Sequence, residues 1–256
     1  MLSIDHSETP YDLRFRVGST PVRVHPFFWL TVAFLGWNWF NQKGGGIGYL
    51  ILWVACCFIS VLLHELGHVW MGMLFGTRGH IVLWSFGGVA IGSNQLAERW
   101  KRIAVSLAGP GIQLLFFGVL QLSHLWILDH IAPDWSDRVY VFLFMLLMIN
   151  KYWALLNLLP IWPLDGGMIA RELCTAASPQ KGGETSLLIS IGVSGILAIH
   201  CLMAYYDKPL VPSLDWLGGI YMTLFFALFC VQSLQIYQQE RSRRNPWRDD
   251  EMPWER

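Results

Sequence analysis

Long apolar runs alternate with short polar segments along the 256-residue chain, and this pattern predicts several transmembrane helices. A helix crosses a bilayer with about 20 consecutive apolar residues. The runs predict six spans, at about Pro26–Phe40, Ile47–Phe75, Ile103–Leu128, Val139–Leu159, Ser186–Tyr206 and Trp216–Tyr237. The first run is shorter than a full crossing, so it would need flanking residues or a locally thinner bilayer. The predicted fold class is an all-α polytopic membrane protein.

The segment Gly79–Gly92, GHIVLWSFGGVAIG, differs from the helical runs because it is rich in β-branched and aromatic residues and has glycines inside. This composition predicts a short β-hairpin with a Gly-Gly turn or bulge between the second and third spans. Lipid-exposed strand edges are not tolerated in hydrocarbon. The hairpin is therefore expected at the membrane surface, or re-entering against protein or a water-filled cavity. A second irregular stretch follows the fourth span, where Pro160 and Pro163 predict a broken helix.

Composition supports the membrane class. Hydrophobic residues make up 54% of the chain and charged residues only 14%, against about a quarter charged in soluble domains. Residues 1–25 are predicted to be a polar cytoplasmic segment without signal-peptide features, residues 26–239 the membrane domain, and residues 240–256 a charged cytoplasmic tail. The five cysteines form no CxxC motif and predict no disulfide scaffold.

The basic residues predict the orientation of the chain in the membrane. Lysine and arginine total 18 and balance 18 acidic residues, so net charge gives no reason to expect a nucleic-acid partner. With six spans, only Lys43, Arg138 and Lys208 fall on the side away from the termini, and Lys151 falls inside the fourth span. The positive-inside rule therefore places both termini in the cytoplasm. The lack of a transit-like N-terminus favours a bacterial cytoplasmic membrane.

Three ionisable residues interrupt the second apolar run at the sequence HELGH. His64 and His68 are four residues apart, so they lie on one face of a helix. At this spacing two imidazoles can bind one zinc ion, and Glu65 between them can act as a base toward a zinc-bound water. Two packing histidines, hydrogen-bonded to neighbours, are the alternative. Ionisable residues inside a span favour the functional interpretation.

A catalytic zinc ion usually has three protein ligands and one position for water. Asp165 is the candidate third ligand, in NLLPIWPLDGG at the cytoplasmic end of the fourth span. A helix broken at membrane depth is tolerated where it lines a protein cavity. Alternatively, Asp165 is a turn residue or a helix N-cap. The second and fourth spans both run toward the cytoplasm, so His64, His68 and Asp165 are expected at a similar depth.

HELGH and NLLPIWPLDGG together resemble the site-2 protease family of intramembrane zinc metalloproteases. Further similarities are VRVHPFFWL at the first span, FGGVA in the hairpin and SLAGPGIQ at the third span, so that residues 22–168 are covered. The resemblance implies one Zn2+ per chain, with His64, His68 and Asp165 as ligands and Glu65 activating water. Without a visible PDZ-like insertion or C-terminal sensing domain, the chain is expected to be a minimal core of the family. One departure is Gln113, which stands in the region where the family has an asparagine.

The chemistry of peptide hydrolysis suggests two further roles. The oxyanion needs a stabilising donor besides zinc, and Asn157 is the candidate, with an interhelical hydrogen bond as the alternative. An extended substrate could add to the edge of the Gly79–Gly92 hairpin as a further strand. The expected partners are a transmembrane protein or peptide substrate, the lipid bilayer and a regulatory membrane protein, with no nucleic acid.

Two other functions fit parts of the pattern. A catalytically inactive relative would bind membrane proteins without cutting them, but all four catalytic positions of the family are filled here. A metal or proton transporter would suit intramembrane polar residues and a broken helix, but it gives no reason for Glu65 between two histidines. Retained zinc, with cleavage lost in Glu65→Gln, would favour the protease.

Overall fold

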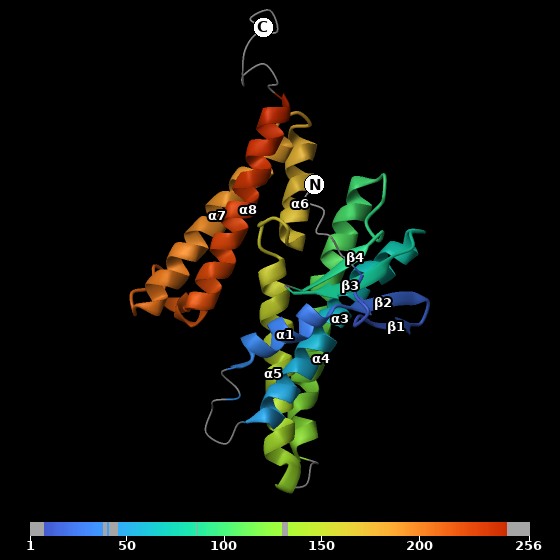
Figure 1. Cartoon of the computed structure of the whole chain (residues 1–256), viewed down its shortest axis with the longest axis vertical. Helices are drawn as coiled ribbons and strands as arrows, with labels where there is room; N and C mark the ends of the chain where they lie inside the picture. The colour runs from blue at the N-terminus through green and yellow to red at the C-terminus, as the bar shows by residue number, and fades with distance from the viewer. Residues whose placement is uncertain (1–7, 38–39, 41–45, 86, 130–132, 245–256) are drawn as a thin grey trace, which may run out of the picture. The chain divides into compact units, whose positions relative to one another are not determined.

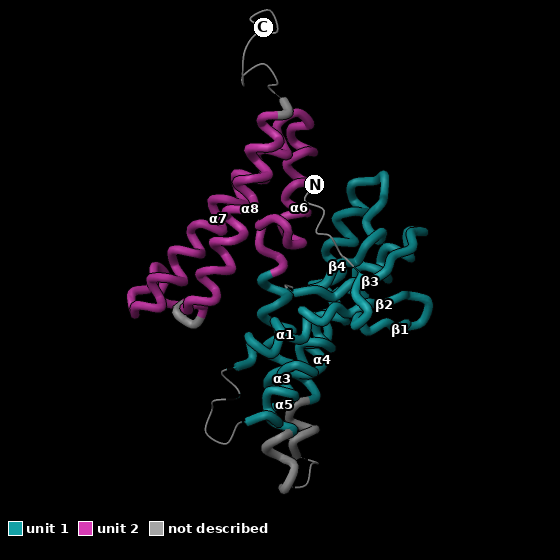
Figure 2. Tube along the Cα trace, viewed as in Figure 1, with its two compact units in different colours: residues 1–156 teal, residues 157–256 magenta. Residues whose placement is uncertain are grey.

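In the computed structural model, the described residues are 8–37, 40, 46–85, 87–129 and 133–244. The chain forms two compact units, residues 1–156 and 157–256, which Figure 2 colours separately. Helices predominate in both, and a small β-sheet belongs to the first (Figure 1). Among the described residues, five helices are long and apolar enough to cross a membrane. The chain is therefore an integral membrane protein, as its composition predicted.

The helices described in the first unit follow the predicted apolar runs: α1 (Pro26–Leu35), α3 (Ile47–Leu74), α4 (Arg99–Asp129) and α5 (Pro133–Asn157). α1 begins where the His25 imidazole accepts a hydrogen bond from the Phe27 amide, with Pro26 in the first turn. α1 has only 10 residues, and part of the predicted first span lies outside the described residues. α3, α4 and α5 match the second, third and fourth predicted spans.

A four-stranded sheet joins the N-terminal segment to the predicted hairpin. Its strands are β1 (Leu13–Val17), β2 (Thr20–Val24), β3 (His80–Trp84) and β4 (Gly87–Ile91), in that spatial order. Both hairpins are antiparallel, and β2 pairs parallel with β3, with Val22 opposite Ile81. The strand pair within Gly79–Gly92 agrees with the prediction, but the all-α class missed β1 and β2. Their parallel partner lies far along the chain, so no local pattern could show that pairing.

The sheet is anchored to α1 and α3 by one cluster of buried apolar side chains. The cluster includes Val22, Val24, Phe28, Val61, Val69, Ile81 and Leu83. Full burial of a side chain of this size contributes about 1.5–3 kcal/mol. The sheet is therefore packed firmly against α3, the helix that contains HELGH.

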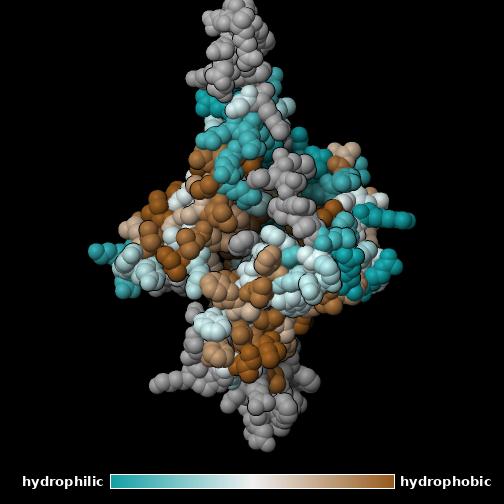
Figure 3. All heavy atoms as spheres, viewed as in Figure 1, coloured by the Kyte–Doolittle hydropathy of each residue, from teal (hydrophilic) through white to brown (hydrophobic). Residues whose placement is uncertain are grey.

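The second unit contains α6 (Asp165–Ala177), α7 (Gly182–Tyr205), a 3-10 helix (Pro212–Leu217) and α8 (Ile220–Arg244). α7 and α8 lie side by side (Figure 1) and match the fifth and sixth predicted spans. His200 of α7 is hydrogen-bonded to the Leu214 carbonyl at 3.0 Å, which identifies it as a packing histidine. Hydrophobic side chains are exposed on both units (Figure 3), as expected for helices that face lipid.

Candidate metal centre

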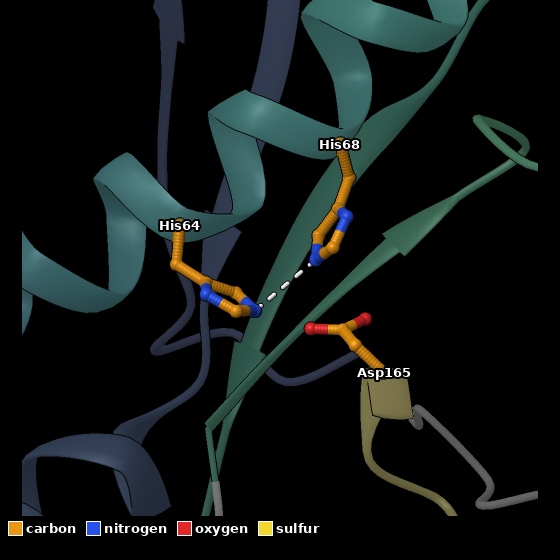
Figure 4. A group of neighbouring side chains, drawn as sticks. All are labelled: His64, His68 and Asp165. Carbon is orange, nitrogen blue, oxygen red and sulfur yellow. Dashed lines mark hydrogen bonds between the residues drawn. The ribbon is translucent and has the colours of Figure 1, made fainter. Parts of the chain in front are cut away.

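His64 and His68 lie on the same face of α3, one turn apart (Figure 4). Both are buried, with 4% and 6% of their surface exposed. Their ring centroids are 4.7 Å apart, and their Nε2 atoms face each other at 3.1 Å. Two nitrogen ligands of a tetrahedral zinc ion, each bonded at about 2.0–2.1 Å, lie about 3.3 Å apart. The two histidines are therefore spaced as ligands of one metal ion are.

Oxygen acceptors determine which nitrogen of each ring carries the proton. The Gln113 amide donates through Nε2 to the Ser60 carbonyl at 3.1 Å, so its Oε1 faces His64 Nδ1 at 2.8 Å. His68 Nδ1 lies 2.7 Å from the Val105 carbonyl oxygen. Each of these Nδ1 atoms must donate, which leaves a lone pair on each Nε2. Two lone pairs at 3.1 Å repel unless a proton or a metal cation lies between them, so the pair is suited to hold a cation.

Asp165 completes a group of three potential ligands. It is the first residue of α6, preceded by Leu164 at the N-cap, and its carboxylate points toward the two imidazoles (Figure 4). One ligand atom from each of His64, His68 and Asp165 lies within 4.8 Å of the other two. Two imidazole nitrogens and a carboxylate oxygen suit zinc and leave a fourth position for water. These are the three residues that the sequence predicted to bind metal, and their assignment as ligands stays a prediction.

Two serines hold the segment that precedes Asp165. The Trp162 amide donates to Ser190 Oγ at 2.8 Å, and Ser190 Oγ lies 2.7 Å from Ser233 Oγ. Ser233 Oγ in turn donates to the Trp162 carbonyl at 3.5 Å. Both polar backbone groups of Trp162 are thus bound by serines of α7 and α8. No local pattern in the sequence reveals these contacts, because a lone serine in an apolar span belongs to no motif.

Two glycines let α4 pack directly against the histidine face of α3. A Cβ on Gly67 would lie 2.6 Å from the Ala108 carbonyl oxygen. A Cβ on Gly109 would lie 2.5 Å from His68 Cε1 and 3.0 Å from His64 Cε1. Distances this short require neighbouring atoms to move, so any side chain at either position would push the helices or the rings apart. SLAGPGIQ is therefore part of the site, whereas the sequence analysis used it only for the resemblance.

Glu65 is buried, with 4% of its surface exposed, and its carboxylate lies against the strand β4. A Cβ on Gly88 would lie 2.6 Å from both Cδ and Oε1 of Glu65. Only glycine therefore leaves room for the carboxylate at this point of the strand. The Gly-Gly pair predicted a turn or bulge, and nothing in the local sequence indicated that Gly88 lies against Glu65.

Asn157, the predicted oxyanion donor, is the last residue of α5 and is 8% exposed. It lies near the end of the fourth predicted span, and its role as an oxyanion donor stays a prediction. Gln113, whose effect was an open question, is fully buried and bonded to His64.

Comparison with known proteins identifies relatives of this chain. The model of peptidase family M50 matches residues 122–199, which include Asp165. Stage IV sporulation protein FB of Bacillus subtilis is 32% identical over 176 residues, which are 66% of this chain and 54% of that protein. A zinc metalloprotease of Methanocaldococcus jannaschii is 29% identical over 196 residues, which are 75% of this chain and 53% of that protein. The chain spans about half the length of these curated relatives.

The fold is shared with a solved structure, the site-2 protease from Methanocaldococcus jannaschii. The TM-score is 0.56 at 24% sequence identity, and the match covers 88% of this chain and 94% of that one. The relatives, the family model and the predicted motifs agree with one another. The family model, the curated relatives and the shared fold therefore agree that this chain is similar to peptidase family M50 and to the site-2 proteases.

Proposed function

We propose that this chain is an intramembrane zinc metalloprotease that cleaves transmembrane segments of membrane-anchored substrates in regulated intramembrane proteolysis. The observation that carries the proposal is the convergence of donor atoms from His64, His68 and Asp165 within 4.8 Å, with the buried Glu65 next to His64 in the chain. Peptide hydrolysis in a bilayer needs a polar site enclosed by protein, because the hydrocarbon core holds no water. A buried ligand cluster with an adjacent base supports this function.

Each residue of the group has a distinct role in the proposed reaction. His64, His68 and Asp165 would hold zinc, which when bound lowers the pKa of a water molecule and polarises the scissile carbonyl. Glu65 accepts the proton of the attacking water and passes it to the leaving amide nitrogen. Asn157 donates a hydrogen bond to the oxyanion of the tetrahedral intermediate.

The edge strand β4 is the proposed binding place for an extended substrate. It ends the sheet in the order β1-β2-β3-β4, and Gly88 of β4 lies against Glu65, so an added strand would run close to the base. Val82 and Leu83 of β3 belong to a buried inner strand, so substitutions there would disturb the sheet itself. A photo-crosslinker at Val89 should instead capture substrate, whereas one at Leu13 on the opposite edge should not. Equal capture at both positions would contradict this binding mode.

We also propose that the chain has six spans, the first of which includes α1. The Gly79–Gly92 hairpin is proposed to lie at the membrane surface or to re-enter the membrane. Both termini are proposed to lie in the cytoplasm of a bacterial cell. The uneven distribution of basic residues supports this orientation. In a background without the native cysteines, Lys208→Cys should react with an impermeant reagent on intact cells. Arg241→Cys should react only after lysis, and the reverse pattern would invert the topology. A regulatory membrane partner stays a prediction.

The test of the function combines metal content with cleavage of a model transmembrane substrate. Purified wild type should hold about one zinc per chain and cleave the substrate. Glu65→Gln should keep the zinc and lose cleavage, and Asp165→Ala should lose most of both. Cleavage that survives in Glu65→Gln would refute the mechanism. Zinc retained without cleavage in wild type would indicate an inactive relative, and metal flux into proteoliposomes would indicate a transporter.

A further inference from the structure

A chain of buried polar groups leads from His64 across three helices. Gln113 of α4 bonds to His64 Nδ1 at 2.8 Å and to the Ser60 carbonyl at 3.1 Å. Asn150 of α5 donates to the Ser60 hydroxyl at 2.9 Å and to the Leu146 carbonyl at 2.8 Å. Gln113, Ser60 and Asn150 are all fully buried. The His64 nitrogen that faces away from the other ligands is thus tied to α3, α4 and α5 together.

The donors and acceptors in this series of hydrogen bonds permit only one orientation of the Gln113 amide. The Ser60 carbonyl oxygen accepts and cannot donate, so the Gln113 amide turns its NH2 group toward Ser60 and its oxygen toward His64. That oxygen requires a proton on His64 Nδ1. A neutral imidazole has one proton, so Nε2 is then the unprotonated nitrogen, which is the form that binds a metal ion.

The two histidines differ in what supports them. His68 Nδ1 is held by the main-chain carbonyl of Val105, which remains whatever side chain stands at position 105. His64 Nδ1 is held by a side chain, so its support depends on the identity of residue 113. A substitution of Gln113 can therefore remove the hydrogen bond to His64 and leave the hydrogen bond to His68 in place.

We propose that Gln113 is a positioning residue that sets the tautomer and ring orientation of His64, so that Nε2 is presented to the metal. The inference rests on the metal site of the proposed function and is independent of proteolysis. Hydrogen-bond partners behind a histidine ligand typically change metal affinity by about 10–100-fold. Gln113, which stands in the region where the family pattern has an asparagine, thereby acquires a physical role.

The first test measures Co2+ affinity in detergent by visible absorption, and Zn2+ affinity by competition. Gln113→Met keeps the side-chain length and removes both hydrogen bonds, whereas Gln113→Glu keeps an acceptor for His64. Gln121→Met makes the same exchange at an exposed position of α4. We expect Gln113→Met to weaken affinity by about 10–100-fold and to alter the Co2+ spectrum. Gln113→Glu should stay closer to wild type than to Gln113→Met, and Gln121→Met should match wild type.

A second variant separates positioning from helix packing. Asn150→Leu removes the donor to the Ser60 hydroxyl and leaves the contact between Gln113 and His64 in place. We expect it to lower thermal stability while metal affinity stays near that of wild type. If Asn150→Leu and Gln113→Met weakened affinity equally, general loosening of the helices would explain both, and the proposal would be overturned.

A third measurement uses the wild type, so it does not depend on whether a variant at position 113 folds. Nitrogen-15 NMR of the metal-free wild type, labelled at histidine, should show His64 protonated on Nδ1, with the signal assigned by its loss in His64→Gln. Protonation on Nε2 would overturn the proposal. Failure of wild type to bind metal would contradict the proposed function, whereas wild-type affinity in Gln113→Met would contradict only the role of Gln113.

Discussion

Gly109 of α4 lies directly against the imidazole of His68. A Cβ at position 109 would approach His68 Cε1 to 2.5 Å and His64 Cε1 to 3.0 Å, so one missing side chain makes room for both rings. Gly111, two residues further along α4, has no atom within 4 Å of an added Cβ. The two glycines therefore offer a matched pair of substitutions.

We predict that Gly109→Ala displaces the imidazoles and weakens metal affinity by at least about 10–100-fold, the range seen when support of a ligand is lost. Gly111→Ala should leave affinity unchanged. It should not lower the unfolding temperature, because alanine is favoured over glycine by about 0.5–1 kcal/mol inside a helix. Metal titration and thermal unfolding of the purified variants check both expectations. Wild-type affinity in Gly109→Ala would contradict the close contact.

Gly88→Ala should reduce cleavage and spare metal binding. The new methyl group would lie 2.6 Å from the Glu65 carboxyl carbon, so the carboxylate must move. General acid–base catalysis contributes about 10²–10⁴-fold, and a displaced base should forfeit much of this factor. Zinc content and kcat for a model substrate are the measurements. Gly118→Ala in α4, where an added Cβ meets no atom within 4 Å, is the control and should stay near wild type.

Ser233→Ala should loosen the segment that carries Asp165. The hydroxyl connects Ser190 to the Trp162 carbonyl, and its loss leaves buried polar groups without that partner. An unsatisfied buried group typically lowers stability by about 1–3 kcal/mol. Ser194→Ala is the control, because the buried Ser194 hydroxyl donates to the Ser190 and Ile191 carbonyls of its own helix. The unfolding temperature and the metal affinity should both fall more in Ser233→Ala than in Ser194→Ala. A larger loss in Ser194→Ala would be inconsistent with this role of Ser233.

Gly67→Ala should separate α3 from α4. Its methyl group would lie 2.6 Å from the Ala108 carbonyl oxygen, and overpacking of this kind typically lowers the free energy of unfolding by about 1–3 kcal/mol. Gly48→Ala in the same helix meets no atom within 4 Å and should be neutral or slightly stabilising. Unfolding in detergent measures the difference. Equal stability of the two variants would refute tight packing at Gly67.

Local sequence patterns predicted the parts of the site that lie close together in the chain. The four-residue spacing of His64 and His68 predicted their common helix face, because the helical repeat fixes that relationship. The composition of Gly79–Gly92 predicted a strand pair, since alternation and glycine placement are local signals. Asp165 was predicted from the break after the fourth span and from the resemblance, and the ligand group contains it.

The contacts missed by the sequence analysis join segments that are distant in the chain. Nothing near Gln113 indicates that it faces His64, and nothing near Gly88 indicates that it faces Glu65. β1 and β2 were read as a polar segment, because five-residue strands beside charged residues give a weak signal without their partner β3. Such pairings depend on which surfaces meet when the helices pack.

By itself the sequence determined that this is a membrane protein, where most of its spans lie, and which residues could bind a metal ion. These properties follow from apolar length and helical periodicity, which act over one or a few turns. Only the tertiary structure decided that Gln113 is hydrogen-bonded to His64, that Gly109 and Gly88 lie against side chains of the HELGH motif, and that two serines hold the Trp162 segment. Close packing and the need to satisfy buried polar groups set these contacts, and both arise only between elements already folded against one another.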